Sequence, residues 1–264
     1  MELVLAGTGT CTPVTDRTPA CYFLKSGARR IIIDPGPGAV NRLVKLGLDP
    51  FDVDAIFISH HHLDHCADLP FYLFSFKYCG SRQAAAPGAA RRRERGIPPV
   101  VVAPEGFKKV YNGILDVFGG MILSNEYEIR IEEVHETEWE WTGDLKFRSI
   151  PMDHFIPSVG YLFSKPGGPS LAYSGDTGLC DGLVKLASQA DALLVECSVP
   201  DNMRMDGHMS PSGIAEAAIA SGVKKVILSH FYPAMDPQVA VDVIRAKGYT
   251  GEIIAGQDGM RLEI

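Results

Sequence analysis

The stretch Ser59-His60-His61-His62-Leu63-Asp64-His65 indicates both the fold and the chemistry of this 264-residue chain. It directly follows the apolar run Ala55–Ile58, so we expect a strand to end where the histidines begin. Neutral imidazoles and a carboxylate are costly to gather unless a partner uses their lone pairs. A pair of divalent metal ions is such a partner, because a tight turn presents alternate residues to two ions. A tag-like histidine run or an accidental surface cluster would not be expected inside the chain, directly after a strand.

Three other apolar runs end in the same way, with polar residues after the strand-like segment. Leu171–Tyr173 leads to Asp176, Ala192–Val195 to Glu196, and Val226–Leu228 to His230. If these runs and Ala55–Ile58 are neighbouring strands, their carboxyl ends deliver His, Asp and Glu side chains to one edge of a sheet. That edge is where α/β proteins place their functional sites.

Short apolar runs alternate with helical patterns along the whole chain, which predicts the α/β class or a mixed α+β class. No internal repeat with a fixed period is visible. Strands are expected at Leu3–Ala6, Cys21–Leu24, Arg30–Ile33, Ala55–Ile58, Val100–Val102, Lys146–Met152, Gly160–Phe163, Leu171–Tyr173, Ala192–Val195, Val226–Leu228 and Glu252–Ala255.

Capping residues and periodicity predict the helices. Ser210 followed by Pro211 begins a helix that runs to about Ser221 and stops at Gly222. Asp236 followed by Pro237 begins another, which ends near Lys247-Gly248. A third is expected from Gly106 to Phe118, ending at Gly119-Gly120. The aromatic run Phe71–Phe76 is expected to bury one helix face, with a platform for substrate stacking as the alternative.

The composition is that of an ordinary soluble globular protein, with 46% hydrophobic and 22% charged residues. No stretch approaches the roughly 20 unbroken apolar residues that a membrane-spanning helix needs. The start Met1–Leu5 lacks the basic and long apolar regions of a signal peptide, so we expect a cytoplasmic protein with no membrane partner. The net charge of -7 argues against a generally basic nucleic-acid-binding surface.

Two further features concern redox state and local charge. Six cysteines lie far apart without C-x-x-C spacing, so we expect reduced and mostly buried thiols. The segment from Cys79 to Pro99 carries five arginines against one glutamate, a local charge of +4 in an acidic chain. Two interpretations of this segment are open: a solvated insertion without a partner, or an arm that steers phosphates or nucleic acid. Binding that weakens steeply with salt would favour the arm.

The combination of motifs resembles the metallo-β-lactamase superfamily. His60-x-His62-x-Asp64-His65 after a strand is similar to the superfamily signature. The other elements follow in the expected order along nearly the whole chain. They are Asp34 in Ile33-Asp34-Pro35-Gly36, His154 in Asp153-His154-Phe155 with its trailing Gly160-Tyr161, Asp176 in Ser174-Gly175-Asp176-Thr177, and His230 in Leu228-Ser229-His230.

Within the superfamily, the chain resembles the ribonuclease Z-like phosphodiesterase branch. Its features include the Gly7-Thr8-Gly9 opening, Glu196 in a segment that is His-Glu-Ala-Thr in the branch, and His208 in Gly207-His208-Met209-Ser210. Two departures are visible. Val195 stands where that segment has its histidine. Only 22 positions separate His154 from Asp176, which leaves no room for the long arm that grips tRNA, so the resemblance does not extend to tRNA 3′ processing.

The resemblance implies a single domain over residues 1–264, an αββα four-layer sandwich with two divalent ions in a groove at one edge. His60, His62 and His154 would hold one ion. Asp64, His65 and His230 would hold the other, with Asp176 bridging both. The ligands suit Zn²⁺ or Mn²⁺. Asp34 would lie behind the ligands and support them.

The same resemblance implies catalytic roles. A hydroxide bridging the two ions would be the nucleophile. Asp64 would orient that hydroxide, His208 would protonate the leaving alkoxide, and Glu196 would hold the other ring nitrogen of His208.

The function implied is a metal-dependent hydrolase, a phosphodiesterase acting on a small or single-stranded phosphodiester. The alternative on the same fold is an ester, thioester or lactone hydrolase, which the pair His208 and Glu196 disfavours. β-Lactam hydrolysis is less favoured, because its zinc enzymes typically have cysteine or another residue where this chain has Asp176. A binding protein that keeps the metals for stability is a further alternative. Related proteins often form homodimers, so the resemblance implies that a homodimer is one option for this chain.

Some polar residues near these motifs have simpler interpretations. His61 lies between ligands and should point away from the metals. Cys66 is expected to pack, and His135 to be a surface histidine among acids. Asp191 resembles a position of the family or is a turn residue before a strand, and Asp258 is either near the site or part of a turn.

Overall fold

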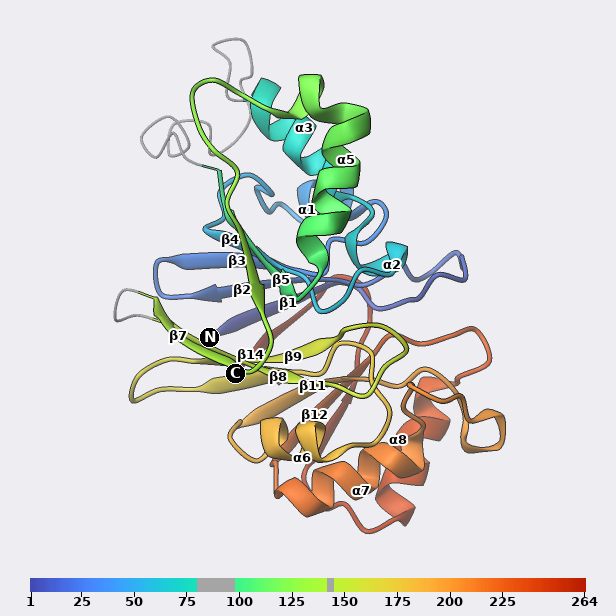
Figure 1. Ribbon diagram of the computed structural model, residues 1–264. Coiled ribbons are helices and arrows are strands. Elements are labelled where there is room, and N and C mark those ends of the chain that lie inside the picture. The colour runs from blue at the N-terminus through green and yellow to red at the C-terminus, as the bar shows by residue number, and fades with distance from the viewer. Residues whose placement is uncertain (80–97, 142–144) are drawn as a thin grey trace.

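Two seven-stranded β-sheets pack face to face and helices cover both outer faces, which gives four layers in the order α/β/β/α (Figure 1). The structure is a computed structural model that describes residues 1–79, 98–141 and 145–264. The first sheet has the order β14 (Met260–Glu263), β1 (Glu2–Gly7), β2 (Cys21–Ser26), β3 (Arg29–Ile33), β4 (Ala55–Phe57), β5 (Val100–Pro104) and β6 (Ile131–Val134). The second has the order β13 (Glu252–Ala255), β12 (Lys225–Ser229), β11 (Ala192–Glu196), β10 (Ser170–Tyr173), β9 (Val159–Ser164), β8 (Leu145–Pro151) and β7 (Thr137–Trp141).

The helices divide between the two outer faces. The first sheet is covered by α1 (Ala39–Lys45), α3 (Leu69–Cys79) and α5 (Phe107–Ile122), and the short α2 (Leu63–Cys66) follows β4 (Figure 1). The second sheet is covered by α6 (Asp181–Ala187), α7 (Pro211–Ser221) and α8 (Pro237–Ala246), and a 3-10 turn, η1 (Asp201–Met203), precedes α7. Among the described residues, no helix combines the length and apolar character needed to cross a membrane.

Burial on both faces explains why the central strands are continuous apolar runs in the sequence. In β3, Ile31 and Ile33 enter the core between the sheets, while Ile32 packs under the helices. The core between the sheets is aromatic at its centre, where the ring of Phe57 lies 4.9–5.0 Å from the rings of Phe147, Tyr161 and Phe163. Residues of both sheets therefore share one apolar layer.

The strand predictions are confirmed for every expected run, and three strands were missed. These are β6, β7 and β14, each at the edge of its sheet. Edge strands carry charged residues on their exposed side, as in Thr137–Trp141 and Met260–Glu263, which weakens the apolar signal. The expectation that the four apolar runs ending in His, Asp or Glu are neighbouring strands of one sheet was wrong. β10, β11 and β12 are parallel neighbours, but β4 belongs to the other sheet.

Two helix predictions need correction. The helix expected to end at Phe118 continues through Gly119-Gly120 to Ile122, because Leu123 N–H donates to the Gly119 carbonyl and Ile122 is buried. Tertiary burial here outweighs the low helix propensity of glycine. The Ser210 side chain does not cap α7; Asp201 accepts from the Ser212 amide instead. Asp236 caps α8 as predicted, accepting from the amides of Gln238 and Val239.

The aromatic run does bury one helix face, since Tyr72 and Leu73 of α3 are fully buried while Phe71 and Phe74 remain partly exposed. The arginines of the 79–99 segment lie in residues 80–97, outside the described residues, and the two interpretations of that segment stay open.

Candidate metal centre

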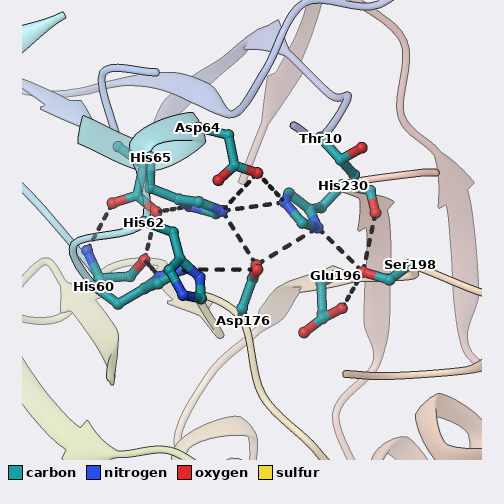
Figure 2. Close-up of polar contacts among 12 residues, drawn as sticks. Thr10, His60, His62, Asp64, His65, Asp176, Glu196, Ser198 and His230 are labelled. Atoms are coloured by element: carbon teal, nitrogen blue, oxygen red, sulfur yellow. Dashed lines mark hydrogen bonds and ion pairs between the residues drawn. The ribbon is translucent and has the colours of Figure 1, made fainter. Parts of the chain in front are cut away.

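Seven His and Asp side chains from four chain segments meet at one edge of the sandwich, and Figure 2 labels all of them except His154. The turn after β4 together with the short α2 supplies four of them, which explains the dense motif in the sequence. The other three come from the second sheet: from the β8–β9 loop, the end of β10 and the end of β12. The seven are His60, His62, Asp64, His65, His154, Asp176 and His230. The site thus lies between the two sheets and requires both.

The first group of ligand atoms comprises three imidazole nitrogens and one carboxylate oxygen. His62 Nδ1 lies 3.1 Å from His60 Nε2 and 3.2 Å from His154 Nε2. Asp176 Oδ2 lies 3.8 Å from His60 Nε2. Metal–nitrogen bonds of about 2.0–2.1 Å in a tetrahedron place ligand atoms roughly 3.3 Å apart, so these spacings match a first coordination shell.

The second group faces the first across Asp176. His65 Nε2 lies 3.1 Å from His230 Nε2, and Asp64 Oδ2 lies 3.4 Å from His230 Nε2. Asp176 Oδ1 lies 3.4 Å from His65 Nε2. The two carboxylate oxygens of Asp176 therefore face different groups, Oδ2 the first and Oδ1 the second. Figure 2 shows the contacts of Asp176 with His65 and His230 of the second group.

The donor chemistry fits divalent metal ions. Asp176 Oδ1 is buried without a hydrogen-bond partner among the described residues. A buried carboxylate oxygen without a donor is costly, and several imidazole nitrogens that converge cannot all satisfy one another. Cations placed among these atoms would satisfy both the oxygen and the nitrogen lone pairs. Mixed nitrogen and oxygen ligands suit several first-row divalent metals.

Protonation at the first group favours metal binding, whereas at His65 of the second group the carboxylates of Asp176 and Asp34 outweigh burial and raise the pKa. Burial lowers the pKa of His60, His62 and His154, which keeps these imidazoles neutral and able to coordinate. Burial alone would raise the pKa of Asp176, but the charges of His230 and His65 outweigh it and hold that pKa well below its ordinary value. The carboxylate is therefore ionised, as a ligand must be.

Each of four ligand rings is held through its second nitrogen. A hydrogen bond at that position fixes the tautomer and the ring orientation, which directs the first nitrogen to the metal. The pairs are His60 Nδ1 with Ser59 Oγ at 3.0 Å, His65 Nδ1 with Asp34 Oδ2 at 2.8 Å, His154 Nδ1 with the Gly207 carbonyl at 2.8 Å, and His230 Nδ1 with Ser198 Oγ at 3.1 Å.

Asp34 organises this support from the end of β3. It accepts hydrogen bonds from the Ser59 amide and hydroxyl, both at 2.6 Å, and from the Tyr173 hydroxyl at 2.5 Å. Its φ of 49° is in the left-handed region, as is the φ of 55° at His230. Two non-glycine residues in this region at one site indicate that the surrounding contacts hold the backbone in a strained conformation.

His208 lies beside the cluster and is paired with Glu196. Its Nδ1 is 3.1 Å from Glu196 Oε2 and 3.8 Å from Asp176 Oδ2. Burial lowers the pKa of His208, but the hydrogen bond to Glu196 and the charge of that carboxylate outweigh burial and raise it. Ser198 donates to Glu196 and also contacts His230, so it joins this pair to the metal cluster. Neither Ser198 nor Tyr173 stands in a sequence motif that predicts such a role.

A cavity of about 510 Å³ opens beside His154 and His208. It lies between the β8–β9 loop and the loop that carries His208. Its walls also include Asp153, Phe155, Leu179, Arg204, Met205, Asp206 and Glu216. The volume suits a small-molecule ligand or part of a larger one.

The remaining sequence candidates lie outside the ligand groups. His61 belongs to none of the groups among the described residues, and Cys66 is buried, which raises its thiol pKa to about 12. His135 is exposed near Glu105. Asp191 accepts from Ser170 in a turn.

Asp258 and Val195 are explained by their surroundings. Asp258 accepts from the amides and hydroxyls of Thr8 and Thr18, so it ties the β1–β2 loop to the loop before β14. Val195 packs under the helices, while Glu196, next along β11, faces the site. The departure from the family segment at Val195 therefore lies on the far side of the strand.

Comparison with known proteins agrees with this geometry. The family model described as Beta-lactamase superfamily domain matches residues 29–231. Ribonuclease Z of Mycobacterium bovis (strain BCG / Pasteur 1173P2) is 27% identical over 288 aligned residues, which cover 100% of this chain and 98% of that protein.

Two solved structures share the fold. The metallo-beta-lactamase fold protein YhfI from Bacillus subtilis is 17% identical with a TM-score of 0.77 and covers 99% of both chains. Human tRNase Z, short form, is 21% identical with a TM-score of 0.77, covering 100% of this chain and 99% of the other. With the family model spanning the motifs from Asp34 to His230, the chain belongs to the beta-lactamase superfamily and has the metallo-β-lactamase fold.

Proposed function

We propose that this protein is a metal-dependent phosphodiesterase of the ribonuclease Z-like branch, acting on a small or single-stranded phosphodiester. The observation that carries the proposal is the pairing of His208 with Glu196 beside the seven-residue cluster. A leaving alkoxide needs a proton, and this histidine is held at the cluster with a raised pKa. The full-length similarity to a protein named ribonuclease Z supports the same reaction class.

We assign two divalent ions, Zn²⁺ or Mn²⁺, to the two ligand groups. His60, His62 and His154 would hold one, Asp64, His65 and His230 the other, and Asp176 both. When bound, such a pair activates water for attack and offsets the charge that develops on the phosphate oxygens.

The residues of the chain would act on the attacking water and on the leaving group. Asp64 accepts a hydrogen bond from the water and orients it. The water oxygen bonds to phosphorus, and the bond from phosphorus to the leaving oxygen breaks with its electron pair on that oxygen. His208 gives this oxygen a proton, while a water proton is released to solvent, from which His208 is protonated again. Glu196 keeps His208 oriented and favours its charged form.

The short connection between His154 and Asp176 supports a substrate other than precursor tRNA. This part of the chain is the antiparallel pair β9 and β10, joined by Lys165–Pro169. No long arm extends from it, and all of its residues are described.

The test is hydrolysis of bis(p-nitrophenyl) phosphate and of the dinucleotide ApA by protein loaded with Mn²⁺ or Zn²⁺, beside a thioester and a lactone. Diester turnover that is lost in Asp176→Ala supports the proposal. Turnover of thioester or lactone alone, unaffected by His208→Ala, would instead favour the carboxylic ester class. Metal-loaded protein inactive on every ester would favour a binding protein. Assembly into a homodimer stays a prediction, which light scattering of the purified protein measures directly.

A further inference from the structure

The position and the lining of the cavity beside His208 indicate which part of the substrate it binds. A phosphodiester carries two alcohol groups on its phosphate, here called its arms. The proton donor must lie next to the arm that leaves. His208 lines the 510 Å³ cavity, whereas a second cavity of about 390 Å³ shares His154 and Phe155 with it but is not lined by His208. The larger cavity therefore lies on the side of the leaving oxygen.

Phe155 gives this cavity an aromatic wall. Its side chain is on the β8–β9 loop directly after His154, and it remains 66% exposed although large apolar groups are normally buried. The ring centroid lies 5.4 Å from that of His154 and 6.4 Å from that of His208. An exposed ring at this distance from the reacting centre offers a stacking surface to a planar group on the leaving arm.

The charges of the lining indicate which planar groups fit. Three carboxylates, from Asp153, Asp206 and Glu216, and one guanidinium, from Arg204, line the cavity. Even with His208 charged, an additional phosphate on the leaving arm would meet three carboxylates against two cationic side chains there. An uncharged ring with hydrogen-bond donors, such as the amino groups of a nucleobase, would meet carboxylate acceptors.

We propose that this cavity is the subsite for the leaving alcohol, and that it accepts an uncharged, ring-bearing alcohol of nucleoside size with Phe155 as the stacking residue. The proposal rests on the proposed phosphodiesterase function and adds the identity of the leaving arm. It separates small diesters from the interior bonds of a long polynucleotide, whose leaving arm carries further phosphates.

Three diesters of adenosine test the subsite. ApA has an uncharged nucleoside as its leaving group, ApA with a phosphate on that nucleoside has a charged one, and adenosine 5′-methyl phosphate has methanol. Product analysis identifies which nucleoside of ApA leaves. We expect the wild-type kcat/KM for ApA to exceed that for the phosphorylated analogue about tenfold. Equal rates, or preference for the analogue, would overturn the proposal.

Substitutions assign the effect to the ring. Phe155→Ala should lower kcat/KM for ApA about tenfold, mostly through KM, and lower that for the methyl diester much less, while Phe155→Trp keeps most of the ApA rate. Phe118→Ala, at a partly exposed phenylalanine on α5 that lines a different cavity, is the matched control and should change neither. Equal losses on both diesters would mean that Phe155 only supports the loop, and the stacking role would be wrong.

Binding separates this proposal from the function on which it rests. Adenosine and AMP are titrated into the metal-loaded protein by calorimetry, which requires no turnover. Adenosine binding weakened by Phe155→Ala supports the subsite even if no diester is cleaved. Absence of adenosine binding in wild-type protein that does cleave bis(p-nitrophenyl) phosphate contradicts the subsite and leaves the phosphodiesterase standing.

Discussion

Nδ1 of His65 lies 2.8 Å from Oδ2 of Asp34, although 31 residues separate them in the chain. Asp34 directly follows β3, and His65 lies in α2 beyond the neighbouring strand β4. The contact orients a ligand of the second group from behind, and the Tyr173 hydroxyl joins it from the second sheet. One carboxylate thus links the ligand turn, its supporting strand and the opposite sheet.

Replacing Asp34 should therefore weaken metal binding more than it weakens the fold. Asp34→Asn keeps the volume but loses the charge that holds His65, and we expect metal affinity to fall about 10–100-fold. Competition with a chromophoric chelator measures this. Asp242→Asn, at an exposed position on α8, is the control and should bind metal like the wild type. Unchanged affinity in Asp34→Asn would show that the ring needs no such support.

The role of His208 should depend on the leaving group. His208→Gln removes the proton donor, so kcat for ApA should fall about 10²–10⁴-fold. The effect on bis(p-nitrophenyl) phosphate should be much smaller, because p-nitrophenolate leaves without a proton. The kcat of Glu196→Gln for ApA should lie between those of the wild type and His208→Gln. Equal losses on both substrates would point to disruption of the cluster rather than loss of a donor.

Gly36 is expected to tolerate no side chain. A Cβ at this position would meet the carbonyl oxygens of Asp64 and Ala20, so Gly36→Ala must displace the turn that carries Asp64. We expect weaker metal binding together with a lower melting temperature. Gly113→Ala is the matched control, because nothing lies within 4 Å of its Cβ in α5. That change should raise the free energy of unfolding by about 0.5–1 kcal/mol.

Removal of metal should destabilise the protein through the seven clustered side chains. At a free metal concentration of 100 times Kd, binding adds about 2.7 kcal/mol to the free energy of unfolding. Thermal unfolding should therefore shift down with EDTA and recover with added Zn²⁺ or Mn²⁺. In Asp176→Ala the melting temperature should respond far less to either treatment. A wild type insensitive to EDTA would contradict a metal-binding cluster.

Asp201 should stabilise the protein in a pH-dependent way. Partial burial raises its pKa, but the hydrogen bonds from Ser212 outweigh burial and lower it below the ordinary value of 3.8. A lowered pKa in the folded state means that the stabilisation is complete above pH 3.8 and is lost as pH falls through the folded-state pKa. Urea unfolding of wild type and Asp201→Asn should therefore give different free energies at neutral pH, by about 0.5–2 kcal/mol as for other helix caps. The two free energies should converge as pH falls through the folded-state pKa of Asp201. A difference that is constant with pH would exclude ionisation of Asp201 as the cause.

The sequence predicted the central strands and the seven clustered His and Asp side chains because both leave local signals. Ile31-Ile32-Ile33 is apolar throughout because both faces of β3 are buried, and the ligand turn has four of the seven side chains within six residues. The edge strands left weaker signals in the sequence. Nothing in the sequence showed that β4 belongs to a different sheet from β10–β12, because pairing between distant strands is decided by packing.

The supporting contacts were harder to predict for the same reason. The Tyr173 hydroxyl reaches Asp34 across 139 residues, and the Gly207 carbonyl reaches His154 across 53. A tyrosine in a strand and a glycine in a loop have no feature in the sequence that separates them from packing and turn residues. Only the spatial arrangement gives them a role.

The division of the ligands between two sheets has a consequence for biosynthesis. His65 and His230 face each other across a separation of 165 residues, so a growing chain carries the first ligands long before the last one exists. At about 5–20 residues per second, that interval is roughly 8–33 s. The early histidine-rich turn is a potential chelator during this time without the partners that complete it. The second group can therefore form a complete set of ligands only after translation has passed His230.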